Sequence, residues 1–188
     1  MNAPKIDRRT LALGLAALAA APNAAAQNSP PAAFEDPRPR AYQLLGQPAP
    51  DFAFPKRGGG MAQRSDYAGR AYILYFGGLW CPDCIVDGAH VNDLAAMAAA
   101  ADIAFLHIHT RGRFGRWGSI DNYFAETGYS YPVAFDESRT WARETYAIEW
   151  NPTYLVIDRA GIIRAWSTDL GEGGAALFFA EAHAIAAN

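Results

Sequence analysis

The chain has 188 residues, of which 51% are hydrophobic and 19% are charged, and its formal net charge is −3. A chain of this length and composition forms a globular domain with a sizeable core, which excludes an intrinsically disordered protein. Proteins that bind nucleic acids usually have a positive net charge, whereas this net charge is weakly negative, so no polyanion partner is expected.

Residues 1–26 predict an export signal. Arg8 and Arg9 precede an uncharged, alanine-rich run, which ends in three small residues typical of a cleavage site. The paired arginines suggest the twin-arginine route, but Asp7 and Leu11 stand where that route usually has Ser or Thr and Phe. The apolar run is too short for a membrane span, so we expect a periplasmic protein whose mature chain has no integral membrane segment.

The remaining sequence predicts a leader followed by one domain. Residues 27–45 are rich in Pro, Ala and Asn and predict a flexible leader, and residues 46–188 predict the domain. Apolar runs predict strands at 52–54, 71–76, 103–109, 131–136, 153–158 and 161–167. Helical patterns occupy 82–101, 119–128, 137–148 and 173–187. This order predicts a three-layer α/β fold with a partly parallel sheet, preceded by the first arm of a β-hairpin.

Two groups of side chains are expected in the core. Helical spacing over residues 82–101 predicts a buried stripe of Ile85, Ala89, Leu94 and Met97. Three aromatic residues are expected to pack inside the domain: Trp141, Trp150 and Trp166.

The two cysteines of the chain, Cys81 and Cys84, are separated by only two residues. A disulfide between them would close a very small ring, which stabilises a fold little. They follow a predicted strand and begin a predicted helix, where unpaired amide groups and the helix dipole lower a thiol pKa. We therefore expect Cys81 to be a nucleophilic thiolate, Cys84 to resolve the mixed disulfide, and Trp80 to contribute an apolar docking surface.

A metal site is the alternative interpretation of the cysteine pair. Cys-x-x-Cys is also a ligand spacing, and a site would need further ligands. His107 and His109 are two residues apart on a predicted strand, so they share one face near its C-terminal end. Core or rim histidines with hydrogen-bonded rings are the favoured explanation of this pair, in which case Cys81 and Cys84 carry redox chemistry and no metal.

Three stretches resemble one family. "WCPDC" after "ILYF", the entry "GQPAPDF" and the late stretch "NPTYLVIDRAGIIR" are similar to the thioredoxin superfamily, and most to its exported TlpA/ResA-like branch, over roughly residues 46–186. The resemblance implies a thioredoxin-like three-layer sandwich with a mixed central sheet and an N-terminal β-hairpin extension. It further implies no cofactor, client proteins with cysteine pairs in cytochrome c or copper-site assembly, and a membrane-bound thiol reductant.

The resemblance also assigns roles to single residues. Pro152 matches the proline whose preceding peptide bond is cis and which faces the cysteines, and Asn151 before it is a departure that would contact the pair or the substrate. Asp87, three residues after the second cysteine, matches an acid that handles the proton of Cys84. Thioredoxins proper carry a buried acid six residues before the first cysteine, and Tyr75 stands there, so that proton relay is missing.

The residues between the cysteines bear on the direction of electron flow. Pro82 and Asp83 are unusual for this branch, which tends to have proline next to the second cysteine. The negative charge of Asp83 opposes thiolate formation, which favours a more reducing pair, and its place in the first helical turn partly offsets this effect. We therefore expect a reductase.

Two further features carry alternatives. "APDF" is shared with peroxiredoxins, but a peroxidase would need Thr or Ser at Gly78 and a proline within residues 70–80, and neither is present. The loop after residue 109 is basic and aromatic, which predicts either a solvated connection or a partner-docking loop through Arg111, Arg113, Phe114, Arg116 and Trp117.

Overall fold

A five-stranded mixed sheet forms the centre of the domain. The computed structural model describes residues 40–138, 140–170 and 174–187, so the export signal and most of the leader lie outside the described residues. The strand order is β5-β4-β3-β6-β7, with β3, β4 and β5 parallel and β6 and β7 antiparallel to their neighbours. The strands are β3 (Tyr72–Gly77), β4 (Ala104–Thr110), β5 (Val133–Asp136), β6 (Thr153–Ile157) and β7 (Ile163–Ser167). The predicted mixed sheet is confirmed.

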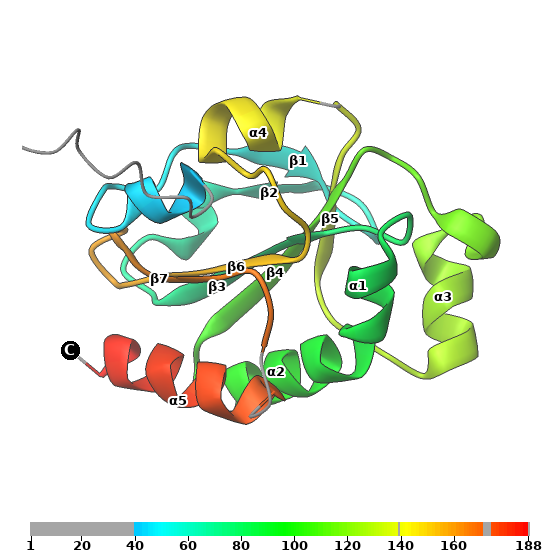
Figure 1. Ribbon diagram of the computed structural model, residues 1–188. Coiled ribbons are helices and arrows are strands. Elements are labelled where there is room, and N and C mark those ends of the chain that lie inside the picture. The colour runs from blue at the N-terminus through cyan, green and yellow to red at the C-terminus, as the bar shows by residue number, and fades with distance from the viewer. Residues whose placement is uncertain (1–39, 139, 171–173, 188) are drawn as a thin grey trace, which may run out of the picture. The chain divides into compact units, whose positions relative to one another are not determined.

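Helices and a hairpin cover the two faces of this sheet (Figure 1). On one face α2 and α5 lie side by side, and on the other lie α4 and the antiparallel hairpin of β1 and β2. The helices are α1 (Pro82–Val86), α2 (Gly88–Ala100), α3 (Ile120–Thr127), α4 (Trp141–Tyr146) and α5 (Gly174–Ala186), and the hairpin strands are β1 (Ala53–Pro55) and β2 (Met61–Gln63). This arrangement is the predicted three-layer sandwich with an N-terminal hairpin.

Alternate residues of β3 build the two cores. Ile73 and Tyr75 belong to the core cluster on the α2 and α5 side, whereas Tyr72, Leu74 and Phe76 belong to the cluster under α4 and the hairpin. All six residues of β3 are buried, because a central strand has a covered surface on both faces. The strand therefore holds its C-terminal end, and the segment that follows it, in a fixed position.

The packed domain begins earlier than residue 46. A short 3-10 helix occupies Arg40–Leu44, and Leu44 and Leu45 pack against the core cluster under α4. The Gly46 amide donates a hydrogen bond to the Ile163 carbonyl at 2.8 Å, which ties this segment to β7. The part of the predicted leader that the structure describes is thus a docked segment.

The helix predicted over 82–101 is divided in two at Asp87. The predicted buried stripe is wrong in its first half, because Ile85 and Ala89 are exposed while Cys84 and Gly88 are buried. A side chain at Gly88 would overlap the Tyr123 hydroxyl, so the helix packs closely against that ring and presents a different face inward. Leu94 is buried and Met97 half-buried, as expected. Within the described ranges, no helix has the length and apolar character needed to cross a membrane.

Candidate active site

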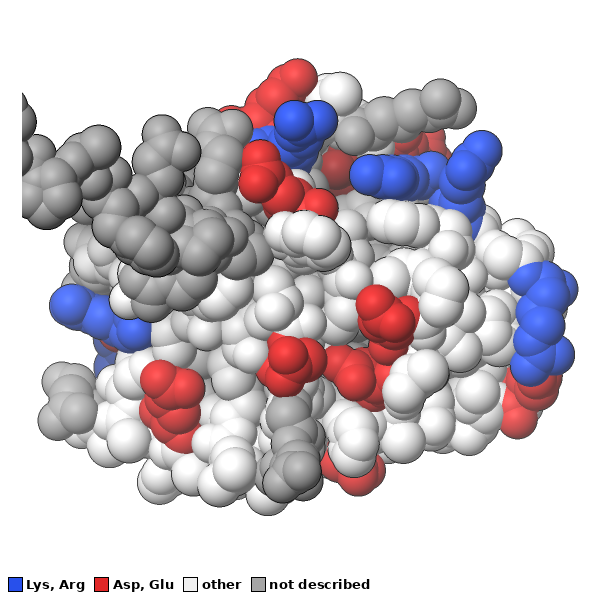
Figure 2. Space-filling model, in the orientation of Figure 1, with Lys and Arg blue, Asp and Glu red and all other residues white. Residues whose placement is uncertain are grey.

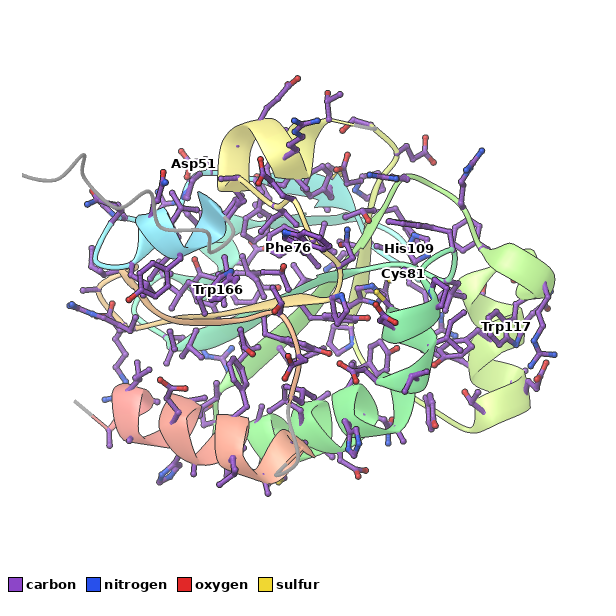
Figure 3. The ribbon with its side chains drawn as sticks, in the orientation of Figure 1. Asp51, Phe76, Cys81, His109, Trp117 and Trp166 are labelled. Atoms are coloured by element: carbon purple, nitrogen blue, oxygen red, sulfur yellow. The ribbon has the colours of Figure 1, made fainter. Side chains whose placement is uncertain are left out.

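Cys81 lies at the N-terminal end of α1 (Figure 3), and only Gly78, Leu79 and Trp80 separate it from the end of the strand β3. It is the N-cap residue of the helix, and its Sγ accepts a hydrogen bond from the Cys84 amide at 3.4 Å. Pro82 follows in the first turn, where a missing N–H is harmless, and both Pro82 and Asp83 are exposed. The local sequence therefore places one sulfur against free amide groups at a helix start.

The two cysteines differ in pKa and not in exposure, since they are 5% and 4% exposed. The hydrogen bond from the Cys84 thiol, helped by the amides of Cys84 and Asp83, lowers the pKa of Cys81 to about 7 against the opposing effect of burial. The negative charge of Asp83 acts in the opposite direction and is the smallest of these effects, so it does not prevent thiolate formation. The same bond to Cys81, together with burial, raises the pKa of Cys84. Cys81 is the sulfur that is ionised near neutral pH.

The loop before β6 closes the site on its other side. The Asn151–Pro152 peptide bond is cis, and Pro152 is buried. The Cys81 thiol donates a hydrogen bond to the Asn151 carbonyl at 3.3 Å, so Asn151 contacts the pair through its backbone. Trp150 is 62% exposed, and the expectation that it packs in the core is wrong because it lies on the outer side of this turn. Trp141 and Trp166 are half-buried and pack against the core.

Trp80 lies between the cysteine and the basic loop. Its Nε1 donates a hydrogen bond to the Thr110 carbonyl at 2.8 Å, which fixes the indole ring at the end of β4. The Arg111 guanidinium lies 4.4 Å from the centre of that ring. Trp80 is half-buried, and its contribution to a docking surface stays a prediction.

Asp87 ends α1 and begins α2, and its carboxylate turns toward the interior. Its Oδ2 accepts a hydrogen bond of 2.9 Å from the hydroxyl of Tyr154, a buried residue of β6. Burial raises the pKa of Asp87, and the bond from Tyr154 opposes this shift. The acid is therefore partly desolvated, as a proton-transfer group requires, but its hydrogen-bond partner is a tyrosine hydroxyl.

Tyr75 is a site residue that the sequence interpretation missed. It is buried on β3, and its hydroxyl forms a hydrogen bond with the Cys84 sulfur that lowers the pKa of that thiol. Burial holds the pKa of Tyr75 well above its usual value, so the phenol stays a hydrogen-bond donor. Its ring stacks on Tyr154 at 4.9 Å, which joins the Cys84 side of the site to the Tyr154–Asp87 pair. The signal was its position, six residues before Cys81.

The predicted histidines are core residues beside the site. His109 stacks on Phe114 at 4.6 Å, and its Nε2 accepts a hydrogen bond from the Leu79 amide at 3.1 Å. His107 is buried, with its ring centre 4.4 Å from that of Tyr75. Within residues 40–138, 140–170 and 174–187, no three His, Cys, Asp or Glu side chains are grouped so that they could hold a metal ion. Cys81, Cys84, His107 and His109 are thus not arranged as a ligand set.

Comparison with known proteins places this geometry in a family. The family model described as "AhpC/TSA family" matches residues 45–166. The thiol-disulfide oxidoreductase ResA of Geobacillus kaustophilus is 25% identical over 120 residues, which are 64% of this chain and 67% of that protein. The thiol:disulfide interchange protein DsbE of Xylella fastidiosa is 26% identical over 131 residues, which are 69% of this chain and 64% of that protein.

Solved structures show the same architecture. A crystal structure of a putative thiol:disulfide interchange protein DsbE from Chlorobium tepidum aligns with a TM-score of 0.57 and 26% identity, over 66% of this chain and 84% of that one. The solution structure of a putative protein disulfide isomerase from Bacteroides thetaiotaomicron aligns with a TM-score of 0.65 at 20% identity, over 77% and 91% of the two chains, and supports the fold alone.

Proposed function

This chain belongs to the AhpC/TSA family of thioredoxin-fold proteins, and from that premise we propose that it catalyses thiol–disulfide exchange with client proteins through Cys81 and Cys84. The observation that carries the proposal is the contrast between the two sulfurs. The pKa of Cys81 is lowered to about 7 by hydrogen bonds at the start of α1, while the pKa of Cys84 is raised. One sulfur is ready to attack, and the other is held protonated one helical turn away.

The exchange proceeds in two displacements. The Cys81 thiolate attacks one sulfur of a client disulfide, which forms a Cys81–client disulfide and releases the first client thiolate. Cys84 then loses its proton and attacks the Cys81 sulfur, which forms the Cys81–Cys84 disulfide and releases the second client thiolate. The client gains two electrons and takes up two protons, one of them from Cys84. The protein is returned to the dithiol by a thiol reductant.

Asp87 is proposed to receive the proton of Cys84. Two observations support this role. The pKa of the half-buried Asp87 carboxyl is raised. Its hydrogen-bond partner, Tyr154, stacks on Tyr75, which is hydrogen-bonded to Cys84. A carboxylate accepts the proton only above its own pKa, so the second displacement should slow as the pH falls through that raised value.

Asp87→Asn should slow the second displacement about tenfold or more at pH 7, because an amide cannot take up a proton there. Single-turnover experiments with acid quenching measure this as accumulation of the Cys81–client disulfide. Raising the pH should recover the rate, since water then deprotonates Cys84. Asp93→Asn removes an exposed acid of α2 and serves as the control. Equal resolution rates in Asp87→Asn and the wild type would exclude this role.

We propose that the protein acts as a reductase. A pKa of about 7 for Cys81 resembles that of reducing thioredoxins, whereas the oxidant DsbA has a pKa of roughly 3.5. Titration against glutathione or dithiothreitol buffers should give a potential nearer about −270 mV than about −120 mV. A potential close to the oxidising value would contradict the reductase direction while leaving the exchange chemistry intact.

A peroxidase is less well supported at this site. A hydroxyl side chain three residues before Cys81 would have to stand at Gly78. A Cβ atom there would overlap the Nε1 edge of Trp80, which is itself bonded to Thr110. The position has no room for Thr or Ser while Trp80 keeps this bond.

Export to the periplasm is proposed from residues 1–26, with 27–45 as a linker of which 40–45 dock on the domain. Relatives named thiol-disulfide oxidoreductase ResA and thiol:disulfide interchange protein DsbE support clients that carry cysteine pairs. Clients in cytochrome c or copper-site assembly and a membrane-bound thiol reductant are proposed from the family resemblance alone. Cleavage after Ala26 leaves Gln27 as the first residue of the mature chain. N-terminal sequencing of the exported protein that still reads residue 1 would reject the cleaved signal.

A further inference from the structure

Arg111 is held in a defined place beside the reactive cysteine. It directly follows β4, and its backbone φ of +69° lies in the left-handed region that residues other than glycine rarely adopt. Its guanidinium stacks 4.4 Å from the ring centre of Trp80, the residue before Cys81, and Trp80 is fixed by its bond to Thr110. This backbone conformation and the stacking on Trp80 keep the Arg111 cation near the site. On a solvated loop without these contacts the side chain would be free to move away.

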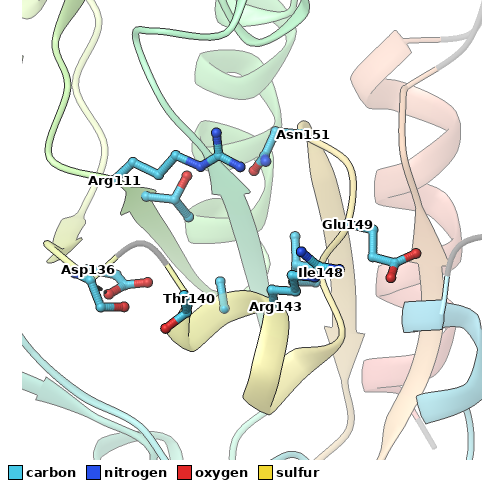
Figure 4. Close-up of a pocket in the computed structure, with 10 residues that line it drawn as sticks. Arg111, Asp136, Thr140, Arg143, Ile148, Glu149 and Asn151 are labelled. Carbon is cyan, nitrogen blue, oxygen red and sulfur yellow. Dashed lines mark hydrogen bonds between the residues drawn. The ribbon is translucent and has the colours of Figure 1, made fainter.

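A groove of about 430 Å³ opens next to this cation (Figure 4). Its walls come from the loop after β4, the end of β5, α4 and the loop before β6, and Figure 4 shows the Arg111 side chain extending toward Asn151. The lining residues are Thr110, Arg111, Asp136, Ser138, Thr140, Ala142, Arg143, Ile148, Glu149 and Asn151. Because the Asn151 carbonyl accepts the hydrogen bond of Cys81, a chain lying in this groove passes close to the reactive sulfur.

The accessible charge of this groove is positive next to Cys81. No carboxylate of the described residues pairs with Arg111 or Arg143, whereas Arg116 of the same loop pairs with Glu126. Asp136 also lines the groove, but it is 2% exposed and its Oδ1 accepts the Ser138 amide at 2.9 Å. The second acid, Glu149, lies on the side of the groove away from Arg111 in Figure 4.

The opposite side of Cys81 carries the opposite charge. The exposed Asp83 belongs to α1, and the half-buried Asp87 directly follows it. Figure 3 shows α1 below Cys81, whereas α4 and the loop after β4, which line the groove, lie above it. Figure 2 shows acidic side chains across the middle of this face, and basic side chains together with acidic ones along its top, where α4 and the loop after β4 lie. A client with an acidic side chain is therefore attracted on one side of Cys81 and repelled on the other, which orients it.

We propose that this Arg111 groove binds the client segment next to the client cysteine and selects an Asp or Glu near that cysteine. The proposal rests on the exchange function above and adds the substrate class. A guanidinium donates two parallel N–H groups, and a carboxylate accepts both with its two oxygens. A glutamine or lysine side chain of the client has no such pair of acceptor oxygens. A partly exposed pair of this kind is expected to change the specificity constant about three- to tenfold.

The test uses three peptides, each carrying one cysteine in a mixed disulfide with neutral 2-mercaptoethanol. The peptides differ at two positions only, the second residue before the cysteine and the second residue after it. Both positions hold Glu in the first peptide, Gln in the second and Lys in the third. The reduced wild-type protein should react with the Glu peptide about three- to tenfold faster than with the Gln peptide, and slowest with the Lys peptide. The preference should shrink as salt is added.

Variants assign the preference to Arg111. Each variant is judged by its Glu-to-Gln rate ratio, in which a change of overall activity cancels. Arg111→Gln should bring the ratio to about one, and Arg111→Lys should keep a reduced ratio because it retains the charge without the planar fork. Arg113→Gln removes an exposed cation of the same loop that does not line the groove, and it should keep the wild-type ratio.

Bis(2-hydroxyethyl) disulfide, which is neutral and has no peptide part, separates this proposal from the proposed function. If the protein reduces this compound and the peptides but the wild-type ratio is about one, the groove does not select acidic clients and exchange still stands. If Arg111→Gln keeps the Glu-to-Gln rate ratio of the wild type, Arg111 does not select acidic clients, and exchange again still stands. If neither the compound nor any peptide is reduced, the exchange function fails, and the groove proposal fails with it.

Discussion

Cys81→Ser should lower the rate of disulfide reduction by about three orders of magnitude or more, because a serine hydroxyl does not ionise near neutral pH. In the wild type about half of Cys81 is thiolate at pH 7, given its pKa of about 7. The second-order rate of the first displacement should therefore rise with pH through about 7 and level off above it. The sign follows from the lowered pKa, since the reactive form is lost as the pH falls through that value. Stopped-flow measurements with a neutral disulfide check both statements.

Cys84→Ser is the matched control for this loss. It keeps the nucleophile and its cap position, so the first displacement should still occur, whereas catalytic turnover should stop because the mixed disulfide has no resolving thiol. The hydrogen bond from Cys84 is the largest cause of the lowered pKa of Cys81, and a serine hydroxyl can donate a similar bond. If Cys81→Ser retains reductase activity within tenfold of the wild type, Cys81 is not the attacking sulfur.

Gly77→Ala should lower the free energy of unfolding by about 2–3 kcal/mol. Gly77 ends β3, and an added Cβ would overlap the hydroxyl oxygen and the Cζ atom of Tyr75. Because Tyr75 is buried between Tyr154 and His107, its ring cannot move aside without disturbing those rings. Urea unfolding, with an unchanged m-value, measures the loss.

Two comparisons isolate the steric cause. Gly69→Ala introduces a residue at a φ of +75° with open space around it, so it should cost about 1 kcal/mol from backbone strain alone. Tyr75→Phe removes one of the overlapping atoms, so the double variant Tyr75→Phe, Gly77→Ala should be more stable than the sum of the two single losses by at least about 0.5 kcal/mol. A Gly77→Ala protein as stable as the wild type would mean that Tyr75 is not packed tightly against the backbone there.

The features predictable from sequence are those with a local cause. The Oγ of Ser119 caps α3 by accepting a hydrogen bond from the Asn122 amide, and Gly128 ends that helix in a left-handed conformation, so the helix lies within the predicted range 119–128. The buried run of β3 and the cysteine pair at a helix start can likewise be predicted from residues that are neighbours in the chain. The cis bond before Pro152 followed from the family resemblance.

The missed features depend on residues far apart in the chain. Tyr154 reaches Asp87 across 67 positions, and no pattern around either residue indicates that contact. The hydrogen bond of Tyr75 to Cys84 and the division of the predicted helix at Asp87 arise in the same way, from how α1 and α2 pack against β3 and Tyr123. The exposure of Trp150 depends on the direction in which the turn before Pro152 leaves the core. Tertiary packing decides these features, so local periodicity could not.

The central claim is that the Cys81 sulfur captures a foreign disulfide, and trapping tests it most directly. The Cys84→Ser protein is incubated at pH 7 with a disulfide-bearing client peptide, and the adduct is located by mass spectrometry of non-reduced proteolytic fragments. The account predicts one client peptide attached to Cys81, and no adduct in the Cys81→Ser protein under the same conditions. An unmodified Cys81 in a folded Cys84→Ser protein, or an adduct on Cys84 in the Cys81→Ser protein, would contradict it.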